Sequence, residues 1–142
     1  MTDNQNNAAN CLLLIRNIEK KLHSKRLELE ALQYRASGAG AIRYDKDHVQ
    51  TSPDDYLAMA MNDIIKLEQQ IEKGEADVEK RKGKAYAIVR QMEKVEQRAL
   101  IEWYYLNGLS MIETSERMSI SERTAYYLRD DALESYGRLL KK

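Results

Sequence analysis

The sequence has no phenylalanine, one proline, six glycines and one cysteine, Cys11, among its 142 residues. Sandwiches and barrels need a turn about every dozen residues, so this shortage of glycine and proline argues against an all-β fold. A single cysteine excludes an internal disulfide and a multi-cysteine zinc or iron–sulfur site, and it favours a reducing compartment. We therefore expect an all-α, cytoplasmic protein.

Long apolar runs and an excess of either charge are also missing. Cys11–Ile15 is among the longest strictly apolar runs, and it is far shorter than the roughly 18 residues of a membrane helix. No basic cluster precedes it, so we expect neither a targeting segment nor membrane contact. The 23 basic residues equal the 23 acidic ones, which removes the usual compositional sign of a nucleic-acid binder.

No catalytic or cofactor motif can be assembled from the residues. The sequence has no Gly-rich phosphate loop, nucleophile elbow, pair of catalytic carboxylates or Cys–His arrangement. His23 and His48 have no cluster of partners, and a metal site needs three or four ligands. We expect that the chain is not an enzyme and takes no metal, cofactor or small-molecule substrate.

The first half of the chain predicts a helical hairpin. Residues 1–9 are polar and rich in amides, and they are expected to form a flexible tail. The apolar residues that follow are spaced alternately by four and three, with Lys25 in the one polar slot; they are Cys11, Ile15, Ile18, Leu22, Leu29 and Leu32. Such a heptad stripe has to pack against a second helix to leave water.

The second helix is expected to begin at Pro53, after a Ser/Gly-containing linker over residues 36–52. Ser52 supplies an N-cap, and Asp54 and Asp55 lie at the positive end of the helix dipole. Its stripe contains Leu57, Met61, Ile64, Leu67, Ile71, Val78, Ala85, Ile88, Met92 and Val95. Folding one helix back on the other gives an antiparallel coiled-coil hairpin over residues 10–94. The second helix outruns the first, which favours a homo-oligomer through the coiled coil.

Residues 95–142 predict three helices joined by two tight corners. The first ends at Asn107 and Gly108, and Ser110 with Glu113 forms a capping box for the second. That helix ends near Met118, and Ser121 or Ser119 caps a last helix that extends towards Leu140. The last helix has an inward stripe of Ala125, Leu128, Ala132 and Leu133. This arrangement is typical of a helix-turn-helix.

Two runs of residues carry a family resemblance. They are R-x-L-I-x-W-Y-Y-L-N-G-L-S over residues 98–110 and I-S-E-R-T-A-Y-Y-L over residues 120–128. Together they resemble the helix-turn-helix of sigma-factor region four, especially in the ArpU and RinA-like late transcription regulators of phages and prophages. The resemblance covers residues 95–142, and those relatives also place a coiled-coil hairpin before this module. It implies a sequence-specific DNA-binding transcription regulator in a bacterial host cell, an activator of late genes that contacts RNA polymerase.

The resemblance also assigns roles to six residues. It implies that Glu122, Arg123, Tyr126 and Tyr127 form the base-reading surface in the major groove, with Ser110 and Ser121 placed at backbone phosphates. Arg129 is added to this DNA-binding surface because the inward stripe leaves it on the exposed side of the last helix. An arginine such as Arg123 can donate two hydrogen bonds to guanine O6 and N7. Residues 95–142 carry seven basic and eight acidic residues, so one module should hold double-stranded DNA weakly and need a second copy or a polymerase partner.

Two other functions fit the same pattern. A small terminase subunit combines helix-turn-helix DNA binding with coiled-coil assembly, but as a packaging protein it forms a ring of many copies. A coiled-coil adaptor could instead bind RNA polymerase without contacting DNA. The basic run Arg81-Lys-Gly-Lys84 could contact phosphates, but a solvated face of the coiled coil is the favoured interpretation.

Overall fold

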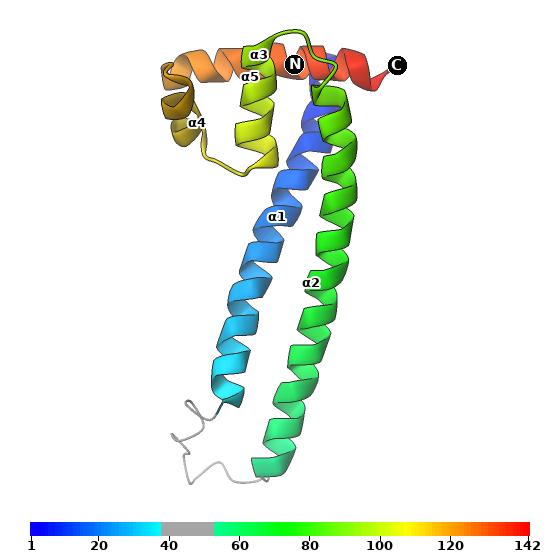
Figure 1. Cartoon of the computed structure of the whole chain (residues 1–142), viewed down its shortest axis with the longest axis vertical. Coiled ribbons are helices and arrows are strands. Elements are labelled where there is room, and N and C mark those ends of the chain that lie inside the picture. The colour runs from blue at the N-terminus through cyan, green and yellow to red at the C-terminus, as the bar shows by residue number, and fades with distance from the viewer. Residues whose placement is uncertain (38–52) are drawn as a thin grey trace. The chain divides into compact units, whose positions relative to one another are not determined.

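The computed structural model describes residues 1–37 and 53–142, and every regular element within these ranges is a helix. In chain order they are α1 (Asp3–Ala36), α2 (Pro53–Val89), α3 (Val95–Leu100), the π-helix η2 (Ile101–Leu106), α4 (Met111–Met118) and α5 (Glu122–Leu140) (Figure 1). The expected all-α class is confirmed. Of the expected linker, residues 38–52 lie outside the described ranges. Among the described helices, none combines the length and apolar character that crossing a membrane requires.

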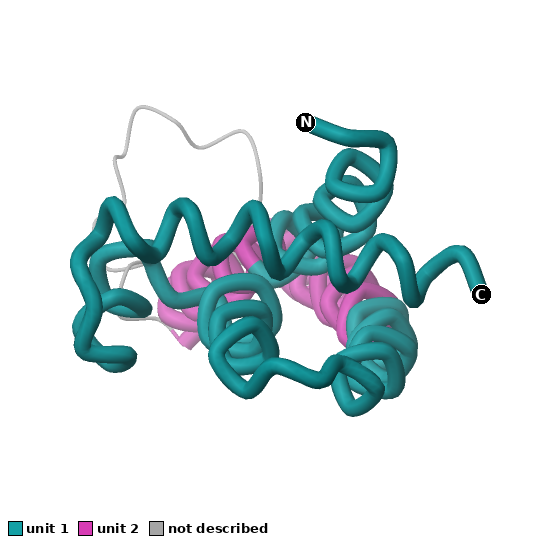
Figure 2. The backbone as a smooth tube through the Cα atoms, turned by 90° about the horizontal axis from the view of Figure 1, so that it is seen from above, with its two compact units in different colours: residues 1–19, 77–142 teal, residues 20–76 magenta. Residues whose placement is uncertain are grey.

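The described residues form two compact units (Figure 2). Unit 1 contains residues 1–19 and 77–142, and unit 2 contains residues 20–76. Both α1 and α2 contribute residues to each unit. The candidate site lies in unit 1.

In unit 2, α1 and α2 lie side by side and bury a narrow apolar seam. Leu22, Leu67 and Ile71 are buried, and Gly74 allows a close approach because a Cβ there would lie 2.6 Å from a methyl carbon of Leu22. An exposed ion pair joins Arg26 to Glu75 at 3.0 Å. Towards the start of α2 the stripe is uncovered, and the side chains of Tyr56, Leu57, Met59, Met61 and Ile65 are all exposed.

The stripe predicted for α1 is confirmed except at its first position. Ile15 and Leu22 are buried, and Ile18, Leu29 and Leu32 are half-buried. Cys11 is exposed, and Leu12 and Ala8 occupy the buried positions instead. Spacings of three and four both lead back from Ile15 to this face, so Leu12 and Cys11 compete for it. The leucine side chain removes more apolar area from water, and it is the one that is buried.

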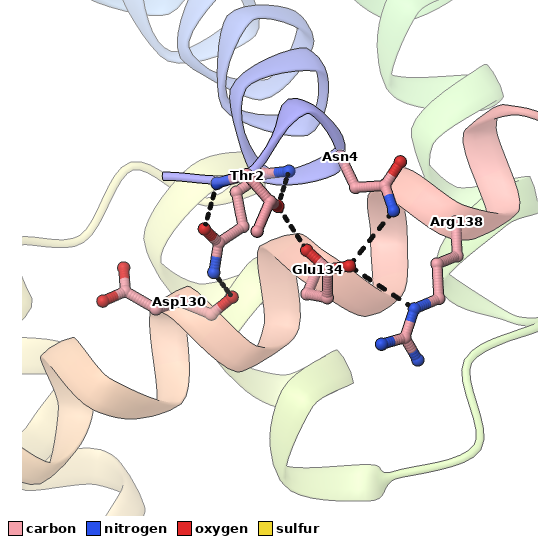
Figure 3. A network of polar contacts seen from close by, with 6 residues as sticks. Thr2, Asn4, Asp130, Glu134 and Arg138 are labelled. Atoms are coloured by element: carbon pink, nitrogen blue, oxygen red, sulfur yellow. Dashed lines mark hydrogen bonds and ion pairs between the residues drawn. The ribbon is translucent and has the colours of Figure 1, made fainter.

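Residues 1–9 differ from the flexible tail that the sequence predicts. Helix α1 begins at Asp3, and Ala8 and Ala9 are buried. The Thr2 hydroxyl and the Asn4 amide both donate to the Glu134 carboxylate, and the Gln5 amide donates to the Asp130 carbonyl (Figure 3). The hydrogen bond from Thr2, and to a smaller extent the one from Asn4, holds the pKa of the Glu134 carboxyl below its usual value. The polar side chains that suggested disorder are therefore the ones that dock the N-terminus on α5.

A glycine in α5 makes this docking possible. A Cβ on Gly137 would lie 2.1 Å from the backbone oxygen of Asn4, which is far inside van der Waals contact. Only a residue without a side chain lets α1 begin so close to α5. Gly83 in α2 provides a contrast, because a Cβ there meets nothing within 4 Å.

We predict that Gly137→Ala lowers the free energy of unfolding by about 1–3 kcal/mol, since the methyl group has to push the start of α1 away. Gly83→Ala is the matched control, and it should raise that free energy by about 0.5–1 kcal/mol through helix propensity. Urea denaturation followed by circular dichroism measures both. If Gly137→Ala also stabilised the protein, the start of α1 could not lie in close contact with Gly137 of α5.

Candidate nucleic-acid interface

Helix α4 begins with a complete capping box. The Ser110 hydroxyl accepts a hydrogen bond from the Glu113 backbone N–H at 3.1 Å, and the Glu113 carboxylate accepts one from the Ser110 N–H at 3.3 Å. Two of the four N–H groups left free at a helix start are satisfied in this way. The capping box and the end of the helix at Met118 were both predicted, and both are confirmed.

A three-residue turn, Ser119-Ile120-Ser121, connects α4 to α5. Ser119 adopts the left-handed conformation, with φ 58° and ψ 41°. The Ser119 N–H donates to Glu116 O at 3.1 Å and the Ile120 N–H to Ser115 O at 3.0 Å, which is the Schellman pattern. Ser121 then caps α5, because its hydroxyl accepts from the Thr124 N–H at 3.0 Å. The structure therefore selects Ser121 as the cap.

Small and polar side chains line the contact between α4 and α5. Thr114, Ser115 and Ala125 are buried, as are Ala132 and Leu133 further along α5. The Thr114 hydroxyl donates to Ser110 O and the Ser115 hydroxyl to Ile112 O, both at 2.8 Å. These hydroxyls are satisfied within their own helix, so burying them at the crossing leaves no hydrogen-bonding group unpaired. The predicted inward stripe of α5 is confirmed, with Leu128 half-buried.

The opposite face of α5 is exposed over its first two turns. Glu122 and Arg123 are exposed, as are Tyr126 and Tyr127 at 42% and 58% of their surface. The Arg123 guanidinium lies 5.8 Å from the centre of the Tyr127 ring and donates to its hydroxyl at 3.4 Å. Such a stack is weak at an exposed site, so the arginine can turn to another acceptor.

The last predicted residue, Arg129, lies at the edge of this face. Its side chain is 25% exposed, forms an ion pair with Asp130 at 3.1 Å, and lies 5.2 Å from the centre of the Tyr126 ring. The structure therefore places Ser121, Glu122, Arg123, Tyr126, Tyr127 and Arg129 along one helix, and Ser110 at the start of another. We call Glu122, Arg123, Tyr126 and Tyr127 the reading face.

The helix before α4 differs from the single α-helix that the sequence predicts for residues 98–106. It begins at Val95 and becomes π-helical from Ile101 to Leu106, and the Asn107 N–H donates to Glu102 O across five residues at 2.8 Å. Ile101, Tyr105 and Leu106 are buried, and burial raises the pKa of the Tyr105 hydroxyl to about 12. Gly108 follows with φ 74°, as the predicted stop requires.

Sequence reasoning missed two arginines that hold this helix in place. Arg16 of α1 lies 4.3 Å from the centre of the Tyr104 ring, and its Nη1 donates to Tyr104 O at 2.6 Å and Leu109 O at 2.9 Å. Arg117 of α4 lies 4.7 Å from the centre of the Trp103 ring. No local pattern marks either residue, although an arginine next to a buried stripe and a lone tryptophan in a short helix are both places to look for partners.

Comparison with known proteins adds a family to this geometry. A family model described as a protein of unknown function, DUF1492, matches residues 43–136. The chain belongs to the DUF1492 family. The match to DUF1492 includes α2 to α4 and most of α5, so it contains the turn and the reading face. No curated protein and no solved structure matches the chain. Within the described ranges of this DUF1492 protein, no group of three or more His, Cys, Asp or Glu residues could hold a metal ion.

The left-handed residue of the turn gives a prediction about stability. Ser119→Gly should raise the free energy of unfolding by about 0.5–1 kcal/mol, because glycine adopts φ 58° without the steric cost of a Cβ. Gly108→Ala is the reciprocal test. It should lower that free energy by about 1 kcal/mol, because an alanine is strained at φ 74°, and a Cβ there would meet no atom within 4 Å that could add a further effect. Chemical denaturation measures both. A loss of stability in Ser119→Gly would contradict the conformation assigned to the turn.

Proposed function

We propose that this DUF1492 protein is a sequence-specific DNA-binding transcription regulator, and that the first two turns of α5 enter the major groove. One observation carries the proposal. Two capped helices, α4 and α5, meet through a three-residue turn with a buried contact between them, and the second presents a polar and aromatic face to solvent at its N-terminal end. In helix-turn-helix proteins it is this part of the second helix that contacts base edges.

The side chains of the reading face suit base recognition. Arg123 has only a weak exposed contact with Tyr127 to give up, so its guanidinium can donate two hydrogen bonds to guanine O6 and N7. Glu122 can accept from cytosine N4, and the tyrosine rings can contact thymine methyl groups or donate to phosphates. Ser110 and Ser121 head helices whose free N–H groups favour a phosphate.

The resemblance to the helix-turn-helix of sigma-factor region four supports a more specific role. On that basis the DUF1492 chain acts as an ArpU or RinA-like late regulator of a phage or prophage, activating late genes together with RNA polymerase. The family match names no function, so this role depends on the residues of α3 to α5.

The charge of residues 95–142 is too close to neutral for one module to bind DNA tightly on its own. Residues 95–142 contain seven basic and eight acidic residues, whereas phosphate neutralisation supplies most non-specific affinity. We propose that a homo-oligomer brings two reading faces to one site, with the exposed apolar residues at the start of α2, such as Leu57 and Met61, as the surface for the second copy.

The proposal predicts which substitutions abolish recognition. Fragments captured by the protein from sheared bacterial and phage DNA at two salt concentrations supply the target. On that target, Arg123→Ala and Tyr126→Ala should each weaken binding by about 1–3 kcal/mol, which is about fivefold to 150-fold. The double variant Arg81→Ala/Tyr34→Ala is the matched control, because it removes an exposed arginine and an exposed tyrosine outside the module.

If Arg123→Ala and Tyr126→Ala bound the target with the affinity and sequence preference of the wild type, the proposal that the reading face recognises DNA bases would be wrong. The same experiment separates the other functions. A specific fragment bound by a ring of many copies, measured by mass, would indicate a small terminase subunit. No salt-dependent binding of any DNA would indicate an adaptor that contacts RNA polymerase alone.

A further inference from the structure

A pocket of about 330 Å³ lies in unit 1, between the α2–α3 connection and the last turns of α5. That volume is at the lower end of the range for small-molecule sites. Its floor contains the buried Met92 and the half-buried Leu139. Its polar lining comes from Gln91, Glu93, Lys94, Gln97, Ser135, Arg138 and Lys142. None of these residues belongs to the reading face.

Gln97 is the residue that points to a ligand. It is 5% exposed and lines the pocket, and its side-chain amide forms no hydrogen bond with described residues but still reaches solvent, since Asn4 Oδ1 is the buried side-chain atom left without a partner in the described ranges. The other buried polar residues, Thr114 and Ser115, bond to carbonyls of their own helix. The Gln97 amide is therefore accessible at the pocket, where its N–H groups and its oxygen can bond to a ligand.

The positive charge of the lining indicates that the ligand carries negative charge. Lys94, Arg138 and Lys142 face a single acidic lining residue, Glu93. The Lys94 and Lys142 ammonium groups form no ion pair with described residues, and Arg138 contacts Glu134 at 3.5 Å with 67% of its side chain exposed. The Ser135 hydroxyl, one turn before Arg138 on α5, adds a donor to the lining. Three cations and two neutral donors around one small space favour an oxyanion.

We propose that this pocket binds the phosphate group of a small organic phosphate. Lys94 and Arg138 contact the phosphate oxygens, Gln97 donates its amide N–H groups to the bound molecule, and Met92 and Leu139 pack against its organic part. The site is independent of the proposed DNA binding, since it uses other residues on other turns of α5.

The test is ligand-induced stabilisation of the full chain in a phosphate-free buffer of low ionic strength. Inorganic phosphate and phenyl phosphate are the probes, and sodium chloride at equal ionic strength is the salt control. Both probes should raise the midpoint of thermal unfolding in a saturable way, and phenyl phosphate should bind more tightly because its ring covers the apolar floor. Sodium chloride should give no saturable rise.

Lys94→Met should weaken binding of both probes about tenfold, since it removes one charge-assisted hydrogen bond. Lys141→Met is the matched control, because Lys141 is exposed and adjacent to Lys142 but lies outside the lining. This control should bind both probes as the wild type does.

Gln97→Leu gives a result that a purely structural role would not. Without ligand its unfolding midpoint should change little, because leucine has a similar volume and the amide forms no hydrogen bond with described residues, whereas its affinity for phosphate should fall about tenfold. The site is excluded if sodium chloride reproduces the phosphate effect. Equal affinity in Lys94→Met, Lys141→Met and Gln97→Leu would exclude it too.

Discussion

The Arg16 guanidinium makes the contact on which the geometry of unit 1 depends. The π-helical segment η2 ends at Leu106, and the last carbonyls of a helix have no N–H partner within it. Arg16 donates to one of them, Tyr104 O, and to Leu109 O in the loop that follows, while its plane covers the Tyr104 ring. A cation at the negative end of a helix is favourable in itself. One side chain therefore fixes both the end of η2 and the approach to Ser110, where α4 begins.

The N-terminal residues are thus part of the C-terminal module in structural terms. Arg16 positions the start of α4, and Thr2 and Asn4 bond to Glu134, two helical turns beyond Tyr127 on α5. The absence of a side chain at Gly137 allows that second contact. The hydrogen bonds from the N-terminal segment end on Asp130 and Glu134, so none of them uses a residue of the reading face.

Much of the module could be predicted because its signals are local. Ser110 with Glu113 and Ser121 with Thr124 act over three residues, and the stripe through Ala125 and Leu133 follows from helical spacing. Sequence reasoning failed where partners are far apart in the chain. Arg16 meets Tyr104 across 88 residues and Asn4 meets Glu134 across 130, and no periodicity records such a pairing. The amide side chains near the N-terminus suggested disorder because the sequence does not indicate which acceptors on α5 they bond to.

The dependence of the module on Arg16 is tested most directly by measuring the unfolding free energy of Arg16→Met together with amide hydrogen exchange over residues 107–112. Methionine keeps most of the side-chain volume and removes both charge-assisted hydrogen bonds. We expect a loss of about 2–3 kcal/mol and faster exchange at Leu109 and the first turn of α4. A loss of unfolding free energy below about 0.5 kcal/mol with unchanged exchange would contradict the dependence on Arg16, because α4 would then be held in place without α1.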